Sequence, residues 1–400
     1  MIYQATAILS LLLLATSCQG LAVIDDAQKL LKPVSDLTAT LSPFDDLVYL
    51  AGGCDSPKGN EFDEGLGMFI CTSLSKSFYA FNPKTNEIEE MKEMPRNRYR
   101  HGAAAVNNQI WLIGGRDGMD EHVNSIDVYD IETNTWSTPG YLPPDYDTSD
   151  NACVSDGNFV YTMGGYIGAN YDTKDTVFRI DTTNYQVIDG LVQVEEVESM
   201  LEPRGDIQAV ATTNDDGEAI VYVTGGFTDQ NNWCKALTTV EVFNFEKASD
   251  GWSQAPSLEE GRADKGLAAL NGQVFALGGE SMIDKICDIT ETEKDSIALW
   301  EQTVAVDDVE VLDGDKWTVL ASLEDHRFRF AAVGFDETDT IYTFGGQLAY
   351  SEDCKCYRAS DEIILFDKNG SGASRSVVAS TAVGILMTAA TTLMLMAELF

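Results

Sequence analysis

PRNRYRHGAAAVNNQIWLIGGRDGMDEHVNSIDVYDIETNTW, the stretch from Pro95 to Trp136, decides the fold of this chain. It contains three short runs with the composition of β-strands, HGAAAV, QIWLIGG and SIDVYD, which are separated by turn residues and followed by a Trp. The middle run ends at Gly114-Gly115, where we expect a backbone conformation that a Cβ would forbid. The stretch therefore predicts a small antiparallel meander. Because such a meander cannot bury its own faces, it should recur along the chain.

The apolar run that ends in Gly-Gly does recur, and an aromatic residue lies shortly before each pair. The first glycines of successive pairs are 62, 50, 61, 53 and 67 residues apart. The six pairs are Gly52-Gly53, Gly114-Gly115, Gly164-Gly165, Gly225-Gly226, Gly278-Gly279 and Gly345-Gly346. This pattern resembles the kelch repeat, as found in galactose-oxidase-like central propellers. The resemblance implies an all-β fold, namely a six-bladed kelch β-propeller of four-stranded antiparallel blades.

The resemblance covers residues 27–370 and implies how the propeller closes. The last repeat contains RFAAVGF, TIYTFGG and DEIILFD but no fourth strand. We expect the N-terminal segment from Leu30 to Val34 to supply that outer strand, paired beside Asp361 to Phe366. Such closure removes an unpaired sheet edge, and an edge strand tolerates the Pro in this segment.

The family pattern also places a large apolar residue on the fourth strand of each blade. Trp136, Trp252 and Trp317 occupy this position after TNT, SDG and GDK. In the first and third repeats Ile88 and Tyr185 stand there instead. We expect all five side chains to be buried plugs of the fold rather than ligand contacts.

Both ends of the chain predict export to the cell surface. Residues 1–20 have the apolar run and small residues of a secretory signal peptide, and Cys18 offers a bacterial lipobox as the alternative. Residues 371–400 are typical of a GPI-attachment signal, with Gly370 as the attachment site, or of a retained transmembrane helix. Asn369 begins a glycosylation sequon beside this anchor. The sequence thus predicts the secretory pathway, with the protein tethered to the outer face of the plasma membrane.

The charge of the chain limits its partners. The chain has 65 Asp and Glu against 26 Lys and Arg, a formal charge of −39. A protein this acidic repels nucleic acid, so we exclude nucleic-acid partners and expect an extracellular protein or glycan. The sequence leaves the oligomeric state open.

The cysteines predict disulfides, since an exported chain meets an oxidising environment. Cys153 is predicted to be a buried free thiol. Cys54 with Cys71 would brace a long loop of the first repeat, and Cys234 with Cys287 would join neighbouring repeats. The six cysteines that lie between second and third strands are Cys54, Cys71, Cys234, Cys287, Cys354 and Cys356. A metal site is disfavoured because no CxxC pair or nearby His accompanies them.

The longest loops indicate where a partner binds. From the second Gly to the plug there are 35 residues in the first repeat and 38 in the fifth, against 20 to 26 in the second to fourth. In a meander these loops share a face with the connections between blades, which carry several arginines. The candidates for a binding face are Arg98, Arg100, Arg204, Arg262 and Arg327. Their guanidinium groups either bind a carboxylate or phosphate of a ligand, or pair with acidic residues of a neighbouring blade.

Enzymatic readings find less support in the sequence. A kelch-type sialic acid mutarotase would need an Arg for the substrate carboxylate and an acid such as Glu202 or Asp206 to move protons. A copper-radical oxidase would need two His and two Tyr, one linked to a Cys; His101 and His326 are the histidines that flank inner strands. The acid-rich loop at residues 55–65 leaves calcium binding open, although it lacks EF-hand spacing. We therefore predict a non-catalytic recognition module without a cofactor.

Overall fold

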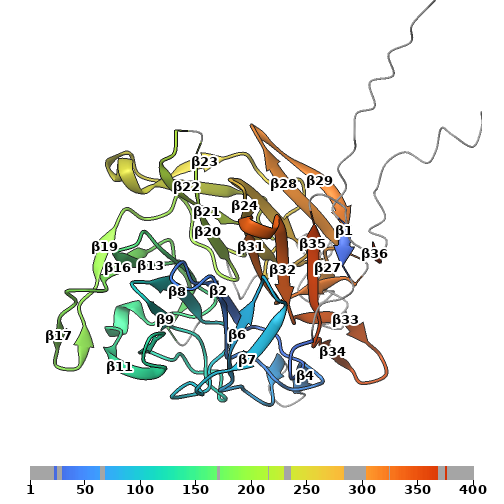
Figure 1. Ribbon diagram of the computed structural model, residues 1–400, viewed down its shortest axis with the longest axis horizontal. Helices are drawn as coiled ribbons and strands as arrows, with labels where there is room; N and C mark the ends of the chain where they lie inside the picture. The colour runs from blue at the N-terminus through green and yellow to red at the C-terminus, as the bar shows by residue number, and fades with distance from the viewer. Residues whose placement is uncertain are drawn as a thin grey trace, which may run out of the picture.

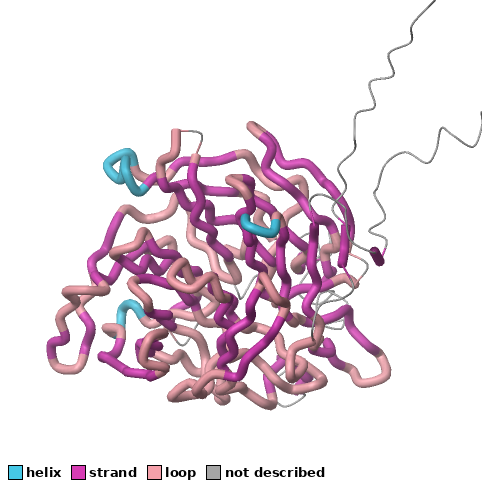
Figure 2. Tube along the Cα trace, viewed as in Figure 1, coloured by secondary structure: helices cyan, strands magenta, loops and turns pink. Residues whose placement is uncertain are grey.

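The computed structural model describes residues 22–24, 29–63, 68–168, 172–214, 216–228, 236–282, 303–323, 325–367 and 374–375. In these residues the chain is built of β-strands with three short 3-10 helices, so the all-β prediction is confirmed (Figures 1 and 2). The helices lie at the periphery of the view in Figure 2 or on short turns between strands. The predicted signal peptide, Gly370 and Asn369 lie outside the described residues, as does most of the segment 371–400.

The predicted four-stranded antiparallel meanders are also confirmed. The first sheet consists of β2 (Thr38–Leu41), β3 (Val48–Ala51), β6 (Phe78–Asn82) and β7 (Glu87–Glu90). The second contains β8 (Gly102–Val106), β9 (Gln109–Ile113), β10 (Ser125–Asp130) and β11 (Thr135–Tyr141). The third consists of β12 (Ala152–Ser155), β13 (Phe159–Met163), β16 (Val177–Asp181) and β19 (Glu195–Val197). The fourth has β20 (Gln208–Thr213), β21 (Ala219–Thr224), β22 (Val240–Asn244) and β23 (Ser253–Ala255). The fifth has β24 (Gly266–Leu270), β25 (Gln273–Leu277), β28 (Asp308–Asp313) and β29 (Lys316–Ser322).

The sixth sheet takes a strand from each end of the described chain. Its order is β31 (Ala331–Phe335), β32 (Thr340–Phe344), β35 (Ile363–Asp367), β1 (Ala22–Ile24) and β36 (Ser374–Arg375). β1 runs antiparallel to β35, with Val23 opposite Phe366 (Figure 1). The sequence prediction that Leu30 to Val34 forms this strand is wrong. Leu30 and Val34 instead place their side chains in the apolar core between the last and first sheets, and Pro33 lacks the N–H that a ladder needs.

Neighbouring sheets contact one another through their first strands. β2, β8, β12, β20, β24 and β31 follow each other in this order, and β31 also lies beside β2. In Figure 1 the blue first sheet and the orange-red last sheet accordingly lie side by side.

The Gly-Gly pairs are needed because the next connecting segment packs directly on them. Gly53 donates its N–H to the carbonyl of Arg98 over 2.9 Å, and Gly346 does the same to Val34 over 2.8 Å. Both glycines of each pair have positive φ, and a Cβ on Gly52 would lie 2.5 Å from the Arg98 carbonyl oxygen. Any other residue would therefore clash with the backbone of the neighbouring repeat.

Of the five predicted plugs of the fourth strands, Trp252 and Trp317 are buried, whereas Trp136 and Ile88 are only partly buried. The indole nitrogens of Trp136, Trp252 and Trp317 each donate to a backbone carbonyl of the preceding repeat. Tyr185 is an exception: its side chain is 37% exposed and packs edge-on against Trp111. The reason is an inserted hairpin, β17 (Val187–Ile188) and β18 (Leu191–Val192), which pairs with β11, so that β19 becomes the fourth strand of the third sheet.

No helix within the described ranges is long and apolar enough to cross a membrane.

Candidate functional site: the central channel and the loop-rich face

A ring of six charged residues, one from each repeat, lies just before the first strands. We call them the ring residues: Asp36, Arg100, Asp150, Asp206, Asp264 and Arg329. All six have positive φ, between 47° and 56°. Most of their backbones are linked in sequence, for example Arg100 N–H to the Asp36 carbonyl (3.1 Å) and Asp36 N–H to the Arg329 carbonyl (2.8 Å). The last of these bonds joins the sixth repeat to the first. The Asp150 carbonyl instead accepts from Ile207 N–H.

The side chains of the ring residues are ion-paired around the ring. Arg100 Nε lies 3.1 Å from a carboxylate oxygen of Asp36, and its Nη1 lies 3.5 Å from Asp150. Arg329 Nε lies 2.9 Å from Asp264. Two arginines thus face four aspartates, and the ring carries an excess of negative charge.

A second layer of side chains covers the ring on one side. It consists of the residue that follows each Gly-Gly pair: Cys54, Arg116, Tyr166, Phe227, Glu280 and Gln347. Four of these contact the ring residue of the next repeat. Arg116 bonds Asp150 (2.7 Å), the Tyr166 hydroxyl donates to Asp206 (2.6 Å), Glu280 pairs with Arg329 (3.1 Å), and Gln347 donates to Asp36 (3.4 Å).

The ring residues line one end of a central channel with a volume of about 700 Å³. We call this end of the channel the neck. Its walls come from the first strands and carry many small side chains, such as Ala39, Ala103, Ala209 and Ala331. The lining also includes three acids beyond the far ends of these strands: Asp46, Asp336 and Glu337. The channel is therefore acidic at both ends, and between them it is lined by small apolar and uncharged polar side chains such as Thr38 and Gln208.

The aspartates of the neck differ in protonation. Burial raises the pKa of Asp206 well above its usual value, and the nearby Asp264 and Asp150 raise it further. Burial would also raise the pKa of Asp150, but Arg116 and Arg100 outweigh it and lower that pKa. These carboxyl groups therefore titrate as a coupled set.

Four of the predicted binding-face arginines do not face a ligand. Arg98, Arg204, Arg262 and Arg327 are at most 1% exposed. Each donates to the carbonyl of the first Gly of its own repeat and pairs with an acid at the third strand. The acids are Asp127, Glu241, Glu310 and Glu362. The binding role predicted for these four arginines is wrong, because their guanidinium groups are buried and bonded to groups inside the protein.

We call the position two residues before each ring residue the anchor position. It holds Val34, Arg98, Thr148, Arg204, Arg262 and Arg327. Arg100 is the fifth predicted binding-face arginine and occupies a ring position instead, where it lines the channel. Arg98 and Arg100 thus have different roles although only one residue separates them.

Loops of the first and last repeats pair in a separate sheet at the end of the molecule that carries the second layer. Its order is β30 (Arg327–Phe328), β33 (Gln347–Ser351), β34 (Cys356–Ala359), β4 (Asn60–Asp63) and β5 (Met68–Cys71). Cys356 lies opposite Glu61, and Tyr357 lies opposite Asn60. We call this sheet the loop sheet.

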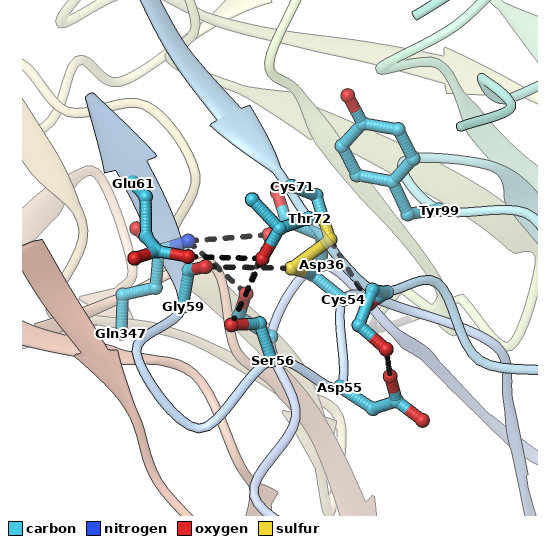
Figure 3. Close-up of a disulfide and its surroundings, with 12 residues drawn as sticks. Asp36, Cys54, Asp55, Ser56, Gly59, Glu61, Cys71, Thr72, Tyr99 and Gln347 are labelled. Atoms are coloured by element: carbon cyan, nitrogen blue, oxygen red, sulfur yellow. Dashed lines mark hydrogen bonds between the residues drawn. A yellow bond between two sulfur atoms is a disulfide. The ribbon is translucent and has the colours of Figure 1, made fainter. Parts of the chain in front are cut away.

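Two disulfides brace the loop sheet. Cys54 is bonded to Cys71 with the Cα atoms 5.8 Å apart, and Cys354 is bonded to Cys356. Figure 3 shows the first bond between Tyr99 on one side and Gly59 on the other; Cys54, Cys71 and Tyr99 form a small apolar cluster. Cys234 and Cys287 lie outside the described residues. Two further loop hairpins are β14 (Tyr166–Ile167) with β15 (Asp172–Thr173), and β26 (Glu280–Met282) with β27 (Thr303–Ala305).

The residues considered for catalysis are scattered. His101 Nε2 lies 3.2 Å from the Thr38 hydroxyl, whereas His326 lies next to the Ala305 carbonyl and Asp307. Cys153 is a free thiol whose pKa burial raises to about 12. Glu202 pairs with Arg204 at 2.7 Å, away from the channel lining.

Asp206 is the exception, since it both lines the channel and has a shifted pKa. The part of the chain that the structure describes contains one group of three potential metal ligands: Asp150, Asp206 and Asp264. Sequence reasoning named Asp206 but missed the ring. An alignment of the repeats on their Gly-Gly pairs would have found it, because each ring residue precedes its first Gly by 14 to 19 residues.

Comparison with known proteins agrees with this geometry. Residues 37–279 match the KLHDC2/KLHL20/DRC7 Kelch-repeats domain. The chain belongs to this kelch-repeat family. The family model covers the repeats in which the anchor arginines Arg98, Arg204 and Arg262 lie, so these side chains are part of a kelch scaffold.

Individual kelch proteins are similar over part of their length. Kelch-like protein 35 of Mus musculus is 26% identical over 51% of this chain and 31% of its own length. Alpha-scruin of Limulus polyphemus is 23% identical over 58% of this chain and 23% of its own length. Kelch domain-containing protein 3 of Rattus norvegicus is 24% identical over 58% and 60%, respectively. The chain thus spans less than a third of the first two relatives and three fifths of the third.

The fold as a whole is similar to a solved structure entitled "Structure of YjhT". The two superpose with a TM-score of 0.63 over 86% of this chain and 98% of that one, at 13% sequence identity. At this identity the likeness shows the fold alone.

Proposed function

We propose that this kelch chain is a closed six-bladed propeller and acts as a non-catalytic recognition module. The bond from Gly346 to Val34, the contact of β31 with β2, and the pairing of β1 with β35 support the closure. A rigid closed scaffold holds loops in fixed positions, and binding residues gather on such loops.

The loop sheet is the observation that carries the proposed function. It joins β33 and β34 of the last repeat to β4 and β5 of the first, and a disulfide ties β5 back to the segment after the first Gly-Gly pair. Loops ordered before binding lose less entropy when a partner docks. Because the anchor arginines are buried, recognition falls to residues exposed on this sheet, such as Lys355 and Arg358.

The proposed partner is an extracellular protein or glycan. In this proposal the chain is exported and tethered through residues 371–400, by a GPI anchor or a retained helix. Treatment of expressing cells with phosphatidylinositol-specific phospholipase would separate the two. Release identifies a GPI anchor, whereas retention of the protein with residues 382–400 still present identifies a membrane-spanning helix.

The test of recognition is a binding screen against displayed extracellular domains and a glycan array, followed by substitution on the loop sheet. Arg358→Glu should weaken binding to any ligand found by about tenfold or more, as expected for a charge within an interface. The matched control is Glu132→Lys, another exposed charge reversal, on the turn between β10 and β11. A ligand whose affinity falls with Glu132→Lys but not with Arg358→Glu would contradict the proposed face.

A sugar-modifying activity is the second candidate, and Asp206 is the observation that favours it. Its carboxyl group lines the channel, and its raised pKa suits a general acid. Incubation of the protein with sialic acid and other sugars would test this, with NMR detection of accelerated anomer exchange. Exchange that is lost in Asp206→Asn would replace the recognition proposal with an enzymatic one.

A further inference from the structure

We propose that the neck of the channel binds one divalent cation, with carboxylate oxygens of Asp150, Asp206 and Asp264 as its ligands. One oxygen from each side chain can be chosen so that all three lie within 4.8 Å of one another. Ca²⁺ binds oxygen at about 2.4 Å, so two oxygens on opposite sides of the ion lie about 4.8 Å apart. The three chosen oxygens therefore lie close enough together to contact one Ca²⁺ ion.

Two of these carboxyl groups have an oxygen without an N–H or hydroxyl donor. Asp150 and Asp206 are each only 6% exposed, and Oδ1 of both accepts no hydrogen bond from an N–H or hydroxyl group of the described residues. The other oxygen of each is used, by Arg116 and by the Tyr166 hydroxyl. The two carboxyl groups bond each other while Asp206 is protonated. Buried carboxylate oxygens are nearly always satisfied, by a protein group, water or an ion, because leaving them bare is costly. A cation at the neck would satisfy both.

The charge of the neck matches a divalent ion once all its aspartates are ionised. Four ionised ring aspartates against Arg100 and Arg329 leave two negative charges (−4 + 2 = −2), so the ion would displace the proton that the raised pKa of Asp206 retains. In the second layer Arg116 carries a positive charge, and burial raises the pKa of Glu280 to about 8, so these two charges cancel only when Glu280 is ionised. Arg100 Nη1 lies 3.5 Å from Oδ1 of Asp150 without donating a hydrogen bond to it, and Arg329 contacts Oδ2 of Asp264. The arginines thus fix the aspartates in place but do not neutralise the ring.

An ion can reach this position through the channel. All three aspartates belong to its lining, and acids also line the channel beyond the far ends of the first strands. These acids and the net charge of −39 raise the local concentration of cations. The ligand set contains carboxylates alone, which favours Ca²⁺, Mg²⁺ or Mn²⁺ over Zn²⁺ or Cu²⁺. The short reach of Mg²⁺, about 2.1 Å, would require the side chains to move closer.

The experiment is calorimetric titration of the metal-stripped protein with Ca²⁺ alone, alongside thermal unfolding with and without Ca²⁺. We expect one saturable site per chain and a rise in Tm on saturation. Asp206→Asn keeps the size of the side chain and an oxygen for the Tyr166 hydroxyl, but it should weaken Ca²⁺ binding by about tenfold or more. The control is Asp46→Asn, which removes the same charge elsewhere in the channel lining and should leave the affinity within about twofold.

Asp264→Asn is the second variant. It keeps the site testable if Asp206→Asn does not fold correctly. Loss of Ca²⁺ binding in whichever variant retains the wild-type circular dichroism spectrum supports the site. The proposal is overturned if the wild-type protein shows no saturable binding at millimolar Ca²⁺, or if both variants bind as tightly as the wild type. The outcome is independent of whether the loop sheet recognises a partner.

Discussion

Arg98 and Arg100 lie two positions apart on the same connection, yet they belong to different parts of the molecule. Arg98 is an anchor residue, buried between strands and paired with Asp127. Arg100 is a ring residue, 11% exposed at its side chain and shared between Asp36 and Asp150. The same alternation separates Arg327 from Arg329. Residue type therefore says little about function here, whereas position relative to the first strand says much.

Substitution at the anchor position should lower the free energy of unfolding more than substitution at the ring position. Arg262 is fully buried, and its guanidinium group is bonded to Glu310 and to the carbonyls of Gly278 and Asp308. Arg262→Met leaves the Glu310 carboxylate buried without a counter-ion, so we expect a loss of about 3–5 kcal/mol of unfolding free energy. Urea denaturation followed by tryptophan fluorescence would measure it.

The double variant Arg262→Met with Glu310→Leu is the matched control, because it removes the stranded charge as well. It should recover a large part of the loss. If the single variant is as stable as the wild type, the anchor arginines are not structural, and their assignment to a binding face would have to be reconsidered.

The first repeat has neither an arginine at its anchor position nor a polar side chain in the second layer. Its second-layer residue is a disulfide-bonded cysteine. Cys54 holds the position that Arg116 or Glu280 holds elsewhere, and its bond to Cys71 closes a loop with a sequence separation of 17. We expect Cys54→Ala with Cys71→Ala to cost about 2–3 kcal/mol, since the unfolded chain regains the entropy of this loop. Urea denaturation under non-reducing conditions gives the value.

Cys153→Ala is the control for this variant, because Cys153 forms no disulfide. A double variant that remains as stable as this control would show that the loop sheet holds its shape without the bond.

The comparison also shows which features the sequence could predict. The Gly-Gly repeat could be recognised because every repeat needs it for the same reason: a Cβ at Gly52 or Gly345 would collide with the segment that enters the neighbouring repeat. The ring could not, since Asp36 or Arg329 in isolation is an ordinary loop residue, and only the contacts between repeats bring the six of them together. The fourth strand of the third sheet was misplaced because an inserted hairpin follows Tyr185.

The partner of β35 was misassigned for a related reason. Leu30 and Val34 have the apolar pattern of a strand, but the fold uses their side chains as core between the last and first sheets. The backbone of this segment still contacts the last repeat, through Leu30 N–H to Asp361 and Val34 N–H to Ser360. Local pattern predicted burial correctly, whereas the pairing depended on residues eight positions earlier.

Replacing a ring arginine should lower the free energy of unfolding less than replacing an anchor arginine does. Arg329 is bonded to Asp264 and Glu280, but it lines the channel, so water can reach acids left unpaired by its removal. We expect Arg329→Gln to lower the unfolding free energy by about 1–2 kcal/mol, below the loss for Arg262→Met. Parallel urea denaturation of the two variants tests the ranking. The reverse order would mean that the ring pairs, which link neighbouring repeats, contribute more to stability than the anchor pairs, which lie within one repeat.

A similarly small effect is expected where the anchor is not an arginine. At Thr148 the hydroxyl group donates to the Gly164 carbonyl over 3.0 Å, the same acceptor position that Arg98, Arg204, Arg262 and Arg327 use in their repeats. Thr148→Val has nearly the same shape but no donor, so the Gly164 carbonyl loses this partner in a buried site. We expect a loss of about 1–2 kcal/mol of unfolding free energy, the usual result of removing one partner of a buried hydrogen bond. Thr148→Ser keeps the donor and should lose less than Thr148→Val if the bond is what matters. Equal losses for the two variants would instead point to the methyl group, and the anchor position of this repeat would then act by packing alone.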